Sequence, residues 1–493
     1  MNSGRNATPD HIMKRPRPSM MTRFRQLGRD GLLAIACIAA FITPGVRAES
    51  LSLMLARTYQ SNPDIQTAVA QVRATAELLP QANSAFLPTI DLVAQEGRSR
   101  IRQNVKDRSQ LGTTINDLDE VTTDRSVRLE ASIYLYQGGA RSANQRSAES
   151  QVASAVAQLD ATVAQTLLQA IQAYGSLLLY HELIQLNADI ERFLVKLMVE
   201  SEDLFSSRLI TLTDLAQTKA SLAQTRSQKA ALRGSLAQAV SQYRAVSGRV
   251  PEQIEQGWSE LPALPTTLSA IQINAQTANP SLRSALLSAE AARAQIDVER
   301  GGLLPNVVAY SSLRRSWDKS RFTSAADYTE LEREDDWSVG VQLEIPLFQG
   351  GLVRSQVREA EAVYTAAKSQ ARSTAVQLSA AIETTWGKWK SALAEQASVA
   401  DEVAAYQETL RGFERQLRDG TSTIKDVLDV RTQLDSALEN QVMVDYDRYS
   451  AQATLLALMG QLSPQALELP VSTLNVWANI DQVRHKVFGI SLP

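Results

Sequence analysis

Two aspartates near the C-terminal end of the chain have the type and spacing to act together. Asp426 and Asp429 follow a short segment rich in Gly, Ser and Thr. A spacing of three places both carboxylates on one face of a helix, where their chemistry would be electrostatic. The alternative is that both are solvated surface side chains, with Asp426 partly serving the N-terminal dipole of the helix that it begins.

Groups suited to catalysis or metal binding are sparse. The chain has three histidines and one cysteine, with 50 basic and 53 acidic residues. His181 lies among apolar residues, and the sequence has neither a glycine-rich phosphate loop nor a Gly-x-Ser-x-Gly nucleophile motif. We therefore expect that the chain is not an enzyme and that it binds no metal and no cofactor. The formal net charge of −3 gives no reason to expect a nucleic-acid partner.

The first 48 residues have the pattern of a secretory signal peptide. Basic residues precede an apolar run that ends near Ile42, and Val46 and Ala48 precede a cleavage site at Glu49. A membrane anchor is the alternative, but it needs about 20 apolar residues and this run is shorter. The remaining sequence has no apolar run of that length. The mature chain is therefore either soluble beyond the inner membrane or crosses a membrane as β-strands.

The chain contains an internal duplication. Three short motifs occur twice in the same order, namely Asn62-Pro63 with Asn279-Pro280, Leu87-Pro88 with Leu304-Pro305, and Gln137-Gly138-Gly139 with Gln349-Gly350-Gly351. Self-similarity of this kind indicates a tandem duplication. We expect a leader (1–48), a first repeat (49–260), a second repeat (261–463) and a C-terminal extension (464–493).

Each repeat is expected to contain a helix, a β-hairpin (86–137 or 303–348) and a long helical hairpin (139–248 or 351–460). Proline is absent from the helical-hairpin segments, which are rich in Ala, Gln, Glu, Arg and Leu. Apolar residues recur there at three- and four-residue spacing. The first helix of each hairpin would have over 60 residues and be on the order of 100 Å long, which is too long for a compact domain. We therefore expect antiparallel coiled-coil packing.

The hydrophobic period changes to two just before each long helix. Apolar and polar residues alternate from Val127 to Tyr136 and from Val339 to Leu347, which indicates strands with one apolar face. We expect each to pair with an earlier strand, 87–101 or 304–317, across a polar connection. An ordinary soluble sheet packed on a core is one interpretation, and a sheet in lipid is the other. Four strands cannot close a barrel in lipid, so several copies would have to share one.

The duplicated motifs, in this order and with constant offsets, resemble the TolC-like outer-membrane efflux proteins. The resemblance covers the chain from Leu51 to about Ser463. It implies an α+β membrane protein that forms a homotrimer. The four strands of each chain would join a shared twelve-stranded β-barrel in the outer membrane, and the tandem coiled-coil hairpins would form an α-barrel in the periplasm.

The resemblance also implies roles for the turns that end the helical hairpins. Asp426 and Asp429 would form rings of carboxylates that constrict the periplasmic end and favour cations. Residues at the turns would contact a periplasmic adaptor, or could equally pack between the hairpins, and these are Arg208, Leu209, Ile210, Thr213, Asp214, Leu215, Gly420 and Ile424.

Some turn residues depart from the family pattern. Arg208 stands where the family usually has glycine, and Leu417 and Ser422 replace a tyrosine and an arginine that hold the closed end together in well-known members. We hypothesise that Arg208 partly replaces this lock by pairing with Asp419 or Asp214.

The implied function is a passive exit duct that serves an inner-membrane transporter, of the ABC or RND class, through the adaptor. The C-terminal tail resembles that of members serving type I protein secretion, and no lipid-anchor cysteine follows the leader. The duct of a multidrug efflux pump is the alternative. A periplasmic coiled-coil adaptor without a pore would explain the helices, but it would not explain two amphipathic β-hairpins. Outer-membrane lipid is the expected surrounding of the sheet.

Overall fold

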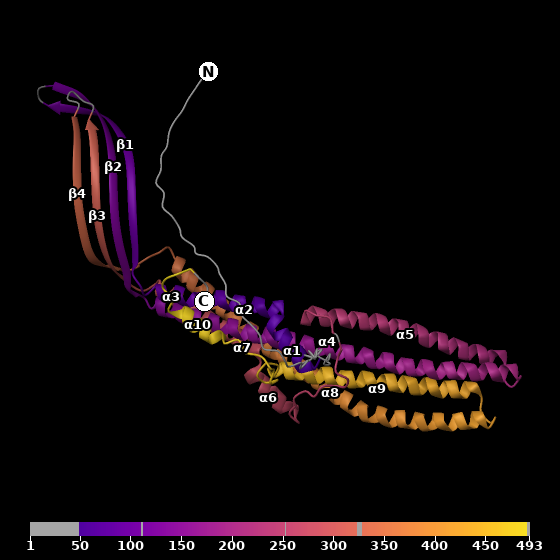
Figure 1. Ribbon diagram of the computed structural model, residues 1–493. Coiled ribbons are helices and arrows are strands. Elements are labelled where there is room, and N and C mark those ends of the chain that lie inside the picture. Colours follow the sequence, from indigo (N-terminus) through magenta and orange to yellow (C-terminus); the bar gives the residue numbers. More distant parts are fainter. Residues whose placement is uncertain (1–48, 110–111, 252, 323–327, 491–493) are drawn as a thin grey trace, which may run out of the picture. The chain divides into compact units, whose positions relative to one another are not determined.

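The structure is a computed structural model that describes residues 49–109, 112–251, 253–322 and 328–490 (Figure 1). The predicted leader, residues 1–48, lies outside the described residues, as do residues 491–493 of the predicted C-terminal extension. No helix within the described ranges has an apolar stretch of sufficient length to pass through a lipid bilayer.

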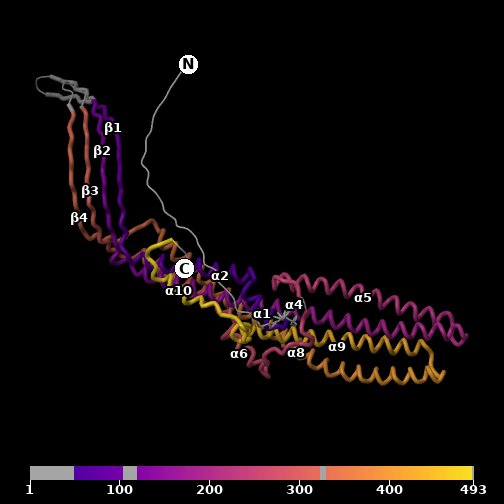
Figure 2. Tube along the Cα trace, in the orientation of Figure 1, coloured from indigo at the N-terminus to yellow at the C-terminus, as the bar shows by residue number. Residues whose placement is uncertain are grey.

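The two halves of the chain carry the same series of elements (Figures 1 and 2). The first half comprises α1 (Leu51–Ser61), α2 (Pro63–Ala76), α3 (Leu78–Ser84), β1 (Thr89–Ser109), β2 (Gly112–Gln137), α4 (Ala140–Ser206) and α5 (Leu212–Ser247). The second half comprises α6 (Leu268–Ala278), α7 (Pro280–Gly301), β3 (Asn306–Phe322), β4 (Tyr328–Glu344), α8 (Leu352–Arg418) and α9 (Ile424–Leu458), and α10 (Val476–Arg484) follows. We infer from this recurrence that the repeats divide near residue 260 and that an extension begins near residue 464.

The duplicated Asn-Pro motif begins a helix in each half and ties it to the end of that half's helical hairpin. The Asn62 side chain accepts a hydrogen bond from the backbone N–H of Asp64 (2.8 Å) and donates one to the Val246 carbonyl (3.1 Å). Asn279 likewise accepts from Leu282 (3.0 Å) and donates to the Leu458 carbonyl (3.0 Å). The following proline fits the first helical position because its missing N–H would have no partner there.

The long helices α4 and α8 each contain 67 residues, so each spans about 100 Å. Each begins after a glycine with a left-handed backbone, Gly139 (φ 80°) or Gly351 (φ 86°). Helix α4 packs against α5, α7 and α9, and α8 packs against α7 and α9 (Figure 1). The predicted long helical hairpins are therefore confirmed.

One large hydrophobic core joins the two halves near α1 and α2. Its fully buried side chains include Leu167, Ile171 and Tyr174 from α4, and Leu455 and Leu456 from α9. Because α4 and α9 come from different halves of the chain, burying these side chains together holds the two helical hairpins side by side.

The strands within the described residues form one antiparallel sheet in the order β1-β2-β3-β4. Side chains of directly paired residues point to the same side of a sheet. Leu92, Leu129, Leu313 and Trp337 form one such row and define what we call the apolar face. Trp337 is 74% exposed and Leu92 is 71% exposed, so none of the described residues of the protomer covers this face. The predicted alternation is therefore confirmed.

The strands are longer than the sequence pattern predicted. The segment between residues 101 and 127, expected to be a polar connection, instead extends β1 to Ser109 and starts β2 at Gly112. The prediction was wrong here because polar residues outnumber apolar ones along this segment and the two do not alternate regularly. The period-two signal is therefore lost, while the backbone ladder continues.

The C-terminal extension packs on the first half of the chain. Ile480 and Val483 of α10 are buried against α2 and α3. The Asn83 side chain donates a hydrogen bond to the Arg484 carbonyl (2.9 Å), and the Leu474 N–H donates one to the Tyr59 hydroxyl (3.2 Å).

Candidate functional site

The turn between α8 and α9 is closed by backbone hydrogen bonds. Gly420 has a φ of 73°, and the Thr421 N–H donates to the Gln416 carbonyl (2.9 Å). Helices commonly end with a residue in the left-handed conformation, followed by an N–H that donates a hydrogen bond to a carbonyl of the last turn. A Cβ at Gly420 would meet nothing within 4 Å, so the backbone conformation rather than space favours glycine.

Asp426 caps the start of α9. Its Oδ2 accepts hydrogen bonds from the Thr423 N–H (2.9 Å), the Thr423 hydroxyl (2.6 Å) and the Ser422 hydroxyl (3.1 Å). The Asp426 N–H in turn donates to the Thr423 hydroxyl (3.3 Å), which completes a capping box. Hydrogen bonds from the Thr423 side chain and backbone lower the pKa of Asp426 from its ordinary value. The helix-terminus role that the sequence left open is thus present in the protomer.

Asp429 lies one turn further along α9 and has a different partner. The Lys425 ammonium donates to Asp429 Oδ2 at 2.6 Å, and both side chains are about half exposed. This hydrogen bond raises the pKa of Lys425. An exposed pair of this kind adds little to stability, so Lys425 can leave Asp429 at low cost when another cation approaches.

The turn between α4 and α5 repeats this arrangement. Asp214 Oδ2 accepts from the Thr211 N–H (3.0 Å) and hydroxyl (2.7 Å), and these hydrogen bonds lower the Asp214 pKa. The Asp214 N–H donates to the Thr211 hydroxyl (3.2 Å), so α5 begins with the same capping box as α9.

Arg208 occupies the place that Gly420 has in the other turn. Its φ is 60°, a left-handed conformation that is unusual for a residue with a Cβ. Within the described part of the protomer, Arg208 forms no ion pair with Asp214 or Asp419. The hypothesised lock is therefore not formed inside one chain, where Asp214 is already bonded to Thr211.

The apolar turn residues divide into exposed and packed sets. Leu209 is 72% exposed, whereas Ile210 is partly buried in a cluster with Leu204 and Leu417. Leu215 is also half-buried, and Thr213 is exposed. Ile424 is 2% exposed and packs between the hairpins, so its expected adaptor contact is not available in this conformation.

An ion pair that was not singled out from the sequence lies further along α9 from the turn. Arg431 of α9 pairs with Asp435 at 2.7 Å, both side chains are 15% exposed, and the guanidinium stacks 4.5 Å from the ring centre of Phe193 on α4. Burial raises the pKa of Asp435 to about 6, although Arg431 opposes this shift. As a separate feature of α4, Asn187 is fully buried, and its amide has no hydrogen-bond partner among the described residues. The Arg431/Asp435 spacing was visible in the sequence, but nothing there distinguished it from a solvated surface pair.

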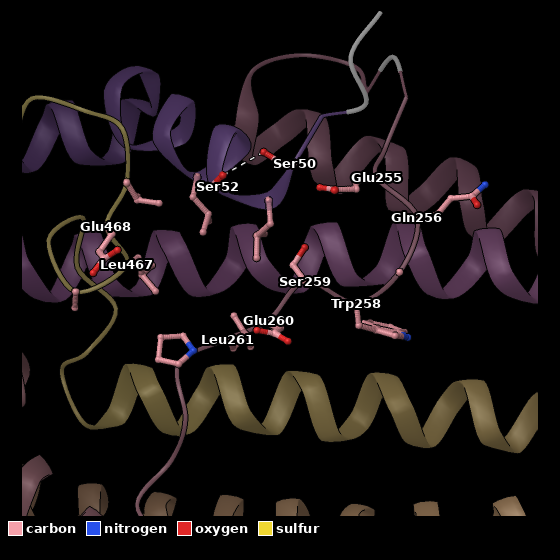
Figure 3. Close-up of a pocket in the computed structure, with 16 residues that line it drawn as sticks. Ser50, Ser52, Glu255, Gln256, Trp258, Ser259, Glu260, Leu261, Leu467 and Glu468 are labelled. Carbon is pink, nitrogen blue, oxygen red and sulfur yellow. Dashed lines mark hydrogen bonds between the residues drawn. The ribbon is translucent and has the colours of Figure 1, made fainter.

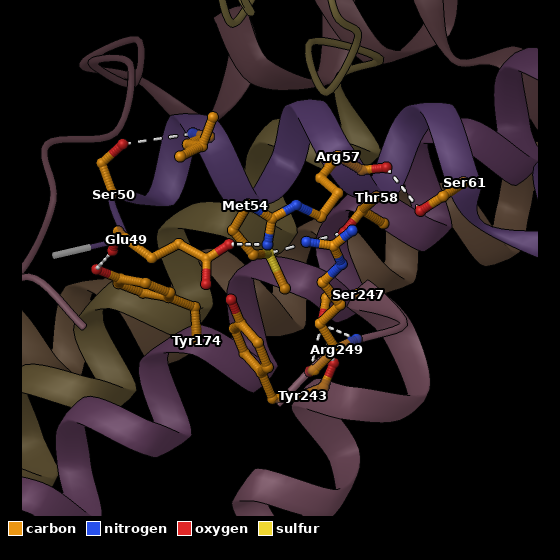
Figure 4. Close-up of polar contacts among 11 residues, drawn as sticks. Glu49, Ser50, Met54, Arg57, Thr58, Ser61, Tyr174, Tyr243, Ser247 and Arg249 are labelled. Carbon is orange, nitrogen blue, oxygen red and sulfur yellow. Dashed lines mark hydrogen bonds and ion pairs between the residues drawn. The ribbon is translucent and has the colours of Figure 1, made fainter. Parts of the chain in front are cut away.

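Glu49, expected to begin the mature chain, is held by contacts on all sides (Figure 4). Its N–H donates to the Gln253 carbonyl (2.7 Å), and its own carbonyl accepts from the Tyr174 hydroxyl (3.1 Å). Its carboxylate pairs with Arg57 at 2.5 Å. The buried Tyr243 ring points its hydroxyl toward the same carboxylate (Figure 4).

A cavity of about 680 Å³ lies beside this anchor, where residues 255–262 cross between the two halves (Figure 3). Ser50 and Ser52 line one side, and Glu468 lies across from them (Figure 3). The described lining contains carboxylates and hydroxyls but no histidine, lysine or cysteine.

Comparison with known proteins gives matches along most of the chain. The family model "Outer membrane efflux protein" matches residues 54–249 and 273–461. The chain is 26% identical over 450 residues to outer membrane efflux protein BepC of Brucella suis, covering 90% of this chain and 93% of that protein. It is 25% identical over 454 residues to outer membrane protein TolC of Escherichia coli, covering 87% of each. It is 23% identical over 425 residues to alkaline protease secretion protein AprF of Pseudomonas aeruginosa, covering 83% and 84%.

Solved structures share the fold. The outer membrane protein VceC of Vibrio cholerae superposes with a TM-score of 0.67 at 19% sequence identity, covering 83% of this chain and 96% of that chain. Because the family model matches both halves of the duplicated chain, the chain belongs to the outer membrane efflux protein family and is a TolC-like outer-membrane channel protein whose helices lie in the periplasm.

Proposed function

We propose that this protein is a homotrimeric exit duct in which three sheets close one twelve-stranded barrel. The observation that carries the proposal is the unfinished sheet. Within the described residues, β1 and β4 each have one unpaired edge, and the apolar face is uncovered. Backbone groups in lipid must find partners, so pairing β4 of one copy with β1 of the next would satisfy both edges.

The opposite face of the sheet suits the inside of a duct. It carries many carboxylates, among them Asp91, Asp124, Glu130, Asp318, Glu330, Glu332, Glu334 and Asp336. Strands that face lipid on one side and a water-filled lumen on the other alternate in this way. An acidic lumen wall would raise the local concentration of cationic cargo.

We propose that Asp426 and Asp429 form the carboxylate rings of the periplasmic constriction. Their place at the start of α9, beside the turn, supports this role, as does the exposure of Asp429. Three copies of each around an axis would favour cations over anions.

The capping role of Asp426 must be separated from a gate role, and the duplicated turn allows this. We would record single-channel currents in planar bilayers for the wild type, Asp426→Asn/Asp429→Asn and Asp214→Asn. The first variant is expected to lose cation selectivity and conduct more current. Asp214→Asn weakens the equivalent cap and is expected to conduct like the wild type. Equal currents from all three would discard the gate.

The exposed turn residues are the proposed contact surface for a periplasmic adaptor. Arg208, Leu209 and Thr213 are exposed in and just after the turn, and the partly exposed Asp214 and Leu215 follow on α5. Gly420 is exposed in the second turn. Leu209→Asp is expected to reduce crosslinking to the adaptor without changing the conductance of the isolated channel.

For the cargo, we propose type I protein secretion with an ABC transporter. AprF, which matches over 83% of this chain, is named for secretion of a protein, and α10 in the C-terminal extension packs on α2 and α3. The duct of a multidrug pump with an RND transporter is the second candidate, because BepC is named as an efflux protein.

A deletion strain separates these two functions. Loss of one or more proteins from the culture medium, with unchanged drug susceptibility, is expected. The reverse result would assign the duct to drug efflux. Fractionation of the same strain carrying the wild-type gene should place the protein in the outer membrane.

A further inference from the structure

The half of the sheet nearest the strand turns carries opposite charges on its two faces. Beyond the Leu92 row, the apolar face continues into rows rich in cations, which are Arg98, Arg100, Arg102, Arg125, Arg315, Lys319, Arg321 and Arg333. Carboxylates on the same face in these rows are Glu96, Asp119 and Asp335. On the opposite face of these rows carboxylates predominate. We call the set of cations the basic belt.

Two of the carboxylates beside the basic belt are each shared between two of its cations. Asp119 contacts both Arg100 and Arg102, the latter at 3.3 Å. Asp335 contacts Arg315 (2.5 Å) and Arg333 (2.7 Å). One carboxylate between two guanidinium groups leaves a net positive charge, so these ion pairs do not neutralise the belt.

Two cations of the belt have no such counter-ion. Arg98 and Lys319 lie in one row on either side of Thr123, and both are exposed. Neither forms an ion pair with another of the described residues. Strands two apart are separated by about 10 Å, so the two side chains can approach one anionic headgroup from opposite sides.

The belt lies where a lipid headgroup would be. On β4 the apolar face runs from Leu343 to Trp337, which is about 20 Å of strand. The apolar band of an outer-membrane barrel is about 25 Å tall and ends in aromatic residues. Trp317 lies on the same face, and Lys319 comes in the next row toward the turn. The belt therefore begins at the edge of the band farther from the helices.

We propose that the basic belt binds the phosphate groups of the phosphorylated glycolipid in the outer leaflet, with Arg98 and Lys319 as its principal ligands. The proposal rests on the proposed placement of the sheet in the outer membrane. The helices lie in the periplasm, so the strand turns and the belt lie on the outer side. Guanidinium groups hold phosphate oxygens through paired, charge-assisted hydrogen bonds, and lysine adds a compact charge.

A lipid fits this surface better than free phosphate does. A hollow of about 530 Å³ adjoins the belt and is lined by Leu92, Leu129, Leu313, Trp317, Trp337 and Arg315, among others. Acyl chains would cover these apolar side chains while the phosphates meet the cations above. Inorganic phosphate would contact only the cations and would leave the apolar side chains of the hollow uncovered.

The test compares two variants of the full-length protein, purified in detergent. Arg98→Gln/Lys319→Gln removes the two belt cations that pair with no carboxylate among the described residues. Arg128→Gln/Arg314→Gln is the matched control, because it removes two cations from one row of the opposite face. Binding of bis-phosphorylated lipid A would be measured by native mass spectrometry, beside lipid A stripped of both phosphates and beside inorganic phosphate.

We expect the first variant to bind lipid A about 25-fold more weakly, because each cation lost near an anionic surface lowers the affinity about five-fold. The control should bind like the wild type, and the dephosphorylated lipid should bind weakly to all forms. Equal binding by both variants would overturn the proposal. So would equal binding of the dephosphorylated lipid, or displacement of lipid A by an equal concentration of inorganic phosphate.

Channel currents from the same preparations separate this proposal from the proposed function. The Arg98→Gln/Lys319→Gln protein is expected to conduct normally, since its changes lie outside the lumen. A wild-type protein that binds lipid A but carries no current would contradict the duct and leave the belt intact. Normal currents without lipid A binding would overturn the belt alone.

Discussion

Asp426 and Asp214 hold equivalent positions in the two hairpin turns. Each follows a threonine by three residues and accepts hydrogen bonds from that threonine's N–H and hydroxyl, at 2.9 and 2.6 Å for Asp426 and at 3.0 and 2.7 Å for Asp214. Each helix start is therefore stabilised without any contact to another chain. Because the two caps match, a role of Asp426 at a pore axis would appear as a difference between the effects of substituting Asp426 and Asp214.

The capping threonines offer the first stability prediction. Thr423→Ala is expected to lower the free energy of opening the first turn of α9 by about 1 kcal/mol, because an N–H at the helix start loses its acceptor. Thr423→Ser keeps the hydroxyl and should stay close to the wild type. Hydrogen exchange at the start of α9 measures this. Equal protection in the alanine and serine variants would show that the cap does not hold the turn.

The two turn residues with left-handed backbones should respond in opposite directions. Gly420→Ala places a Cβ on a residue with φ 73°, and we expect a loss of about 1 kcal/mol from backbone strain alone. Arg208→Gly removes the backbone strain that a Cβ causes at φ 60° and should therefore stabilise its turn. Hydrogen exchange at the ends of α4 and α8 compares them. Destabilisation by Arg208→Gly would mean that the arginine side chain has a partner in the assembled protein.

The buried Arg431/Asp435 pair makes stability depend on pH. Burial raises the pKa of Asp435 from 3.8 to about 6, so the folded chain holds this proton more tightly than the unfolded chain does. The group therefore opposes folding when ionised above pH 6. Its penalty is relieved as the pH falls through 6, and it is gone below about pH 4. The full change is about 3 kcal/mol at most.

Infrared titration of the purified protein can test this carboxyl directly. A protonated carboxyl signal should appear near pH 6 in the wild type and be absent from Asp435→Asn. The stability of that variant should also be flatter between pH 4 and 6. If all carboxyls in the wild type titrate near pH 4, the pair is more solvated than its 15% exposure indicates.

The anchor at Glu49 gives a prediction about burial of charge. Arg57→Met removes the partner of a carboxylate whose side chain is only 11% exposed, and we expect a loss of about 3 kcal/mol or more. Glu49→Gln in the same background should recover part of that loss because no charge remains unpaired. Thermal unfolding of Arg57→Met, of Glu49→Gln alone, of the double variant and of the wild type forms a double-mutant cycle. Independent effects of the two changes would show that Glu49 and Arg57 are not coupled.

Periodicity in the sequence was enough to predict the duplicated helical hairpins and the apolar face of the strands. These features are local, because a helix or a half-buried strand repeats its environment every few residues and selects side chains to match. The same signal failed between residues 101 and 127, where the sequence is mostly polar without regular alternation although both strands continue. The Thr423 and Asp426 spacing was also visible, and the resemblance to a known family supplied the gate hypothesis.

Tertiary structure decided which of these residues meet. From the sequence, Ile424 could contact an adaptor or pack between the hairpins, and it is buried because α8, α9 and α4 converge on it. Arg431 and Asp435 have the spacing of an ordinary surface pair, and only the approach of α4 with Phe193 makes them a desolvated one. The basic belt required the register of all four strands, since Arg98 and Lys319 are distant in sequence and share a row only through β2. Burial and cross-strand pairing depend on segments far apart in the chain, so no local pattern can specify them.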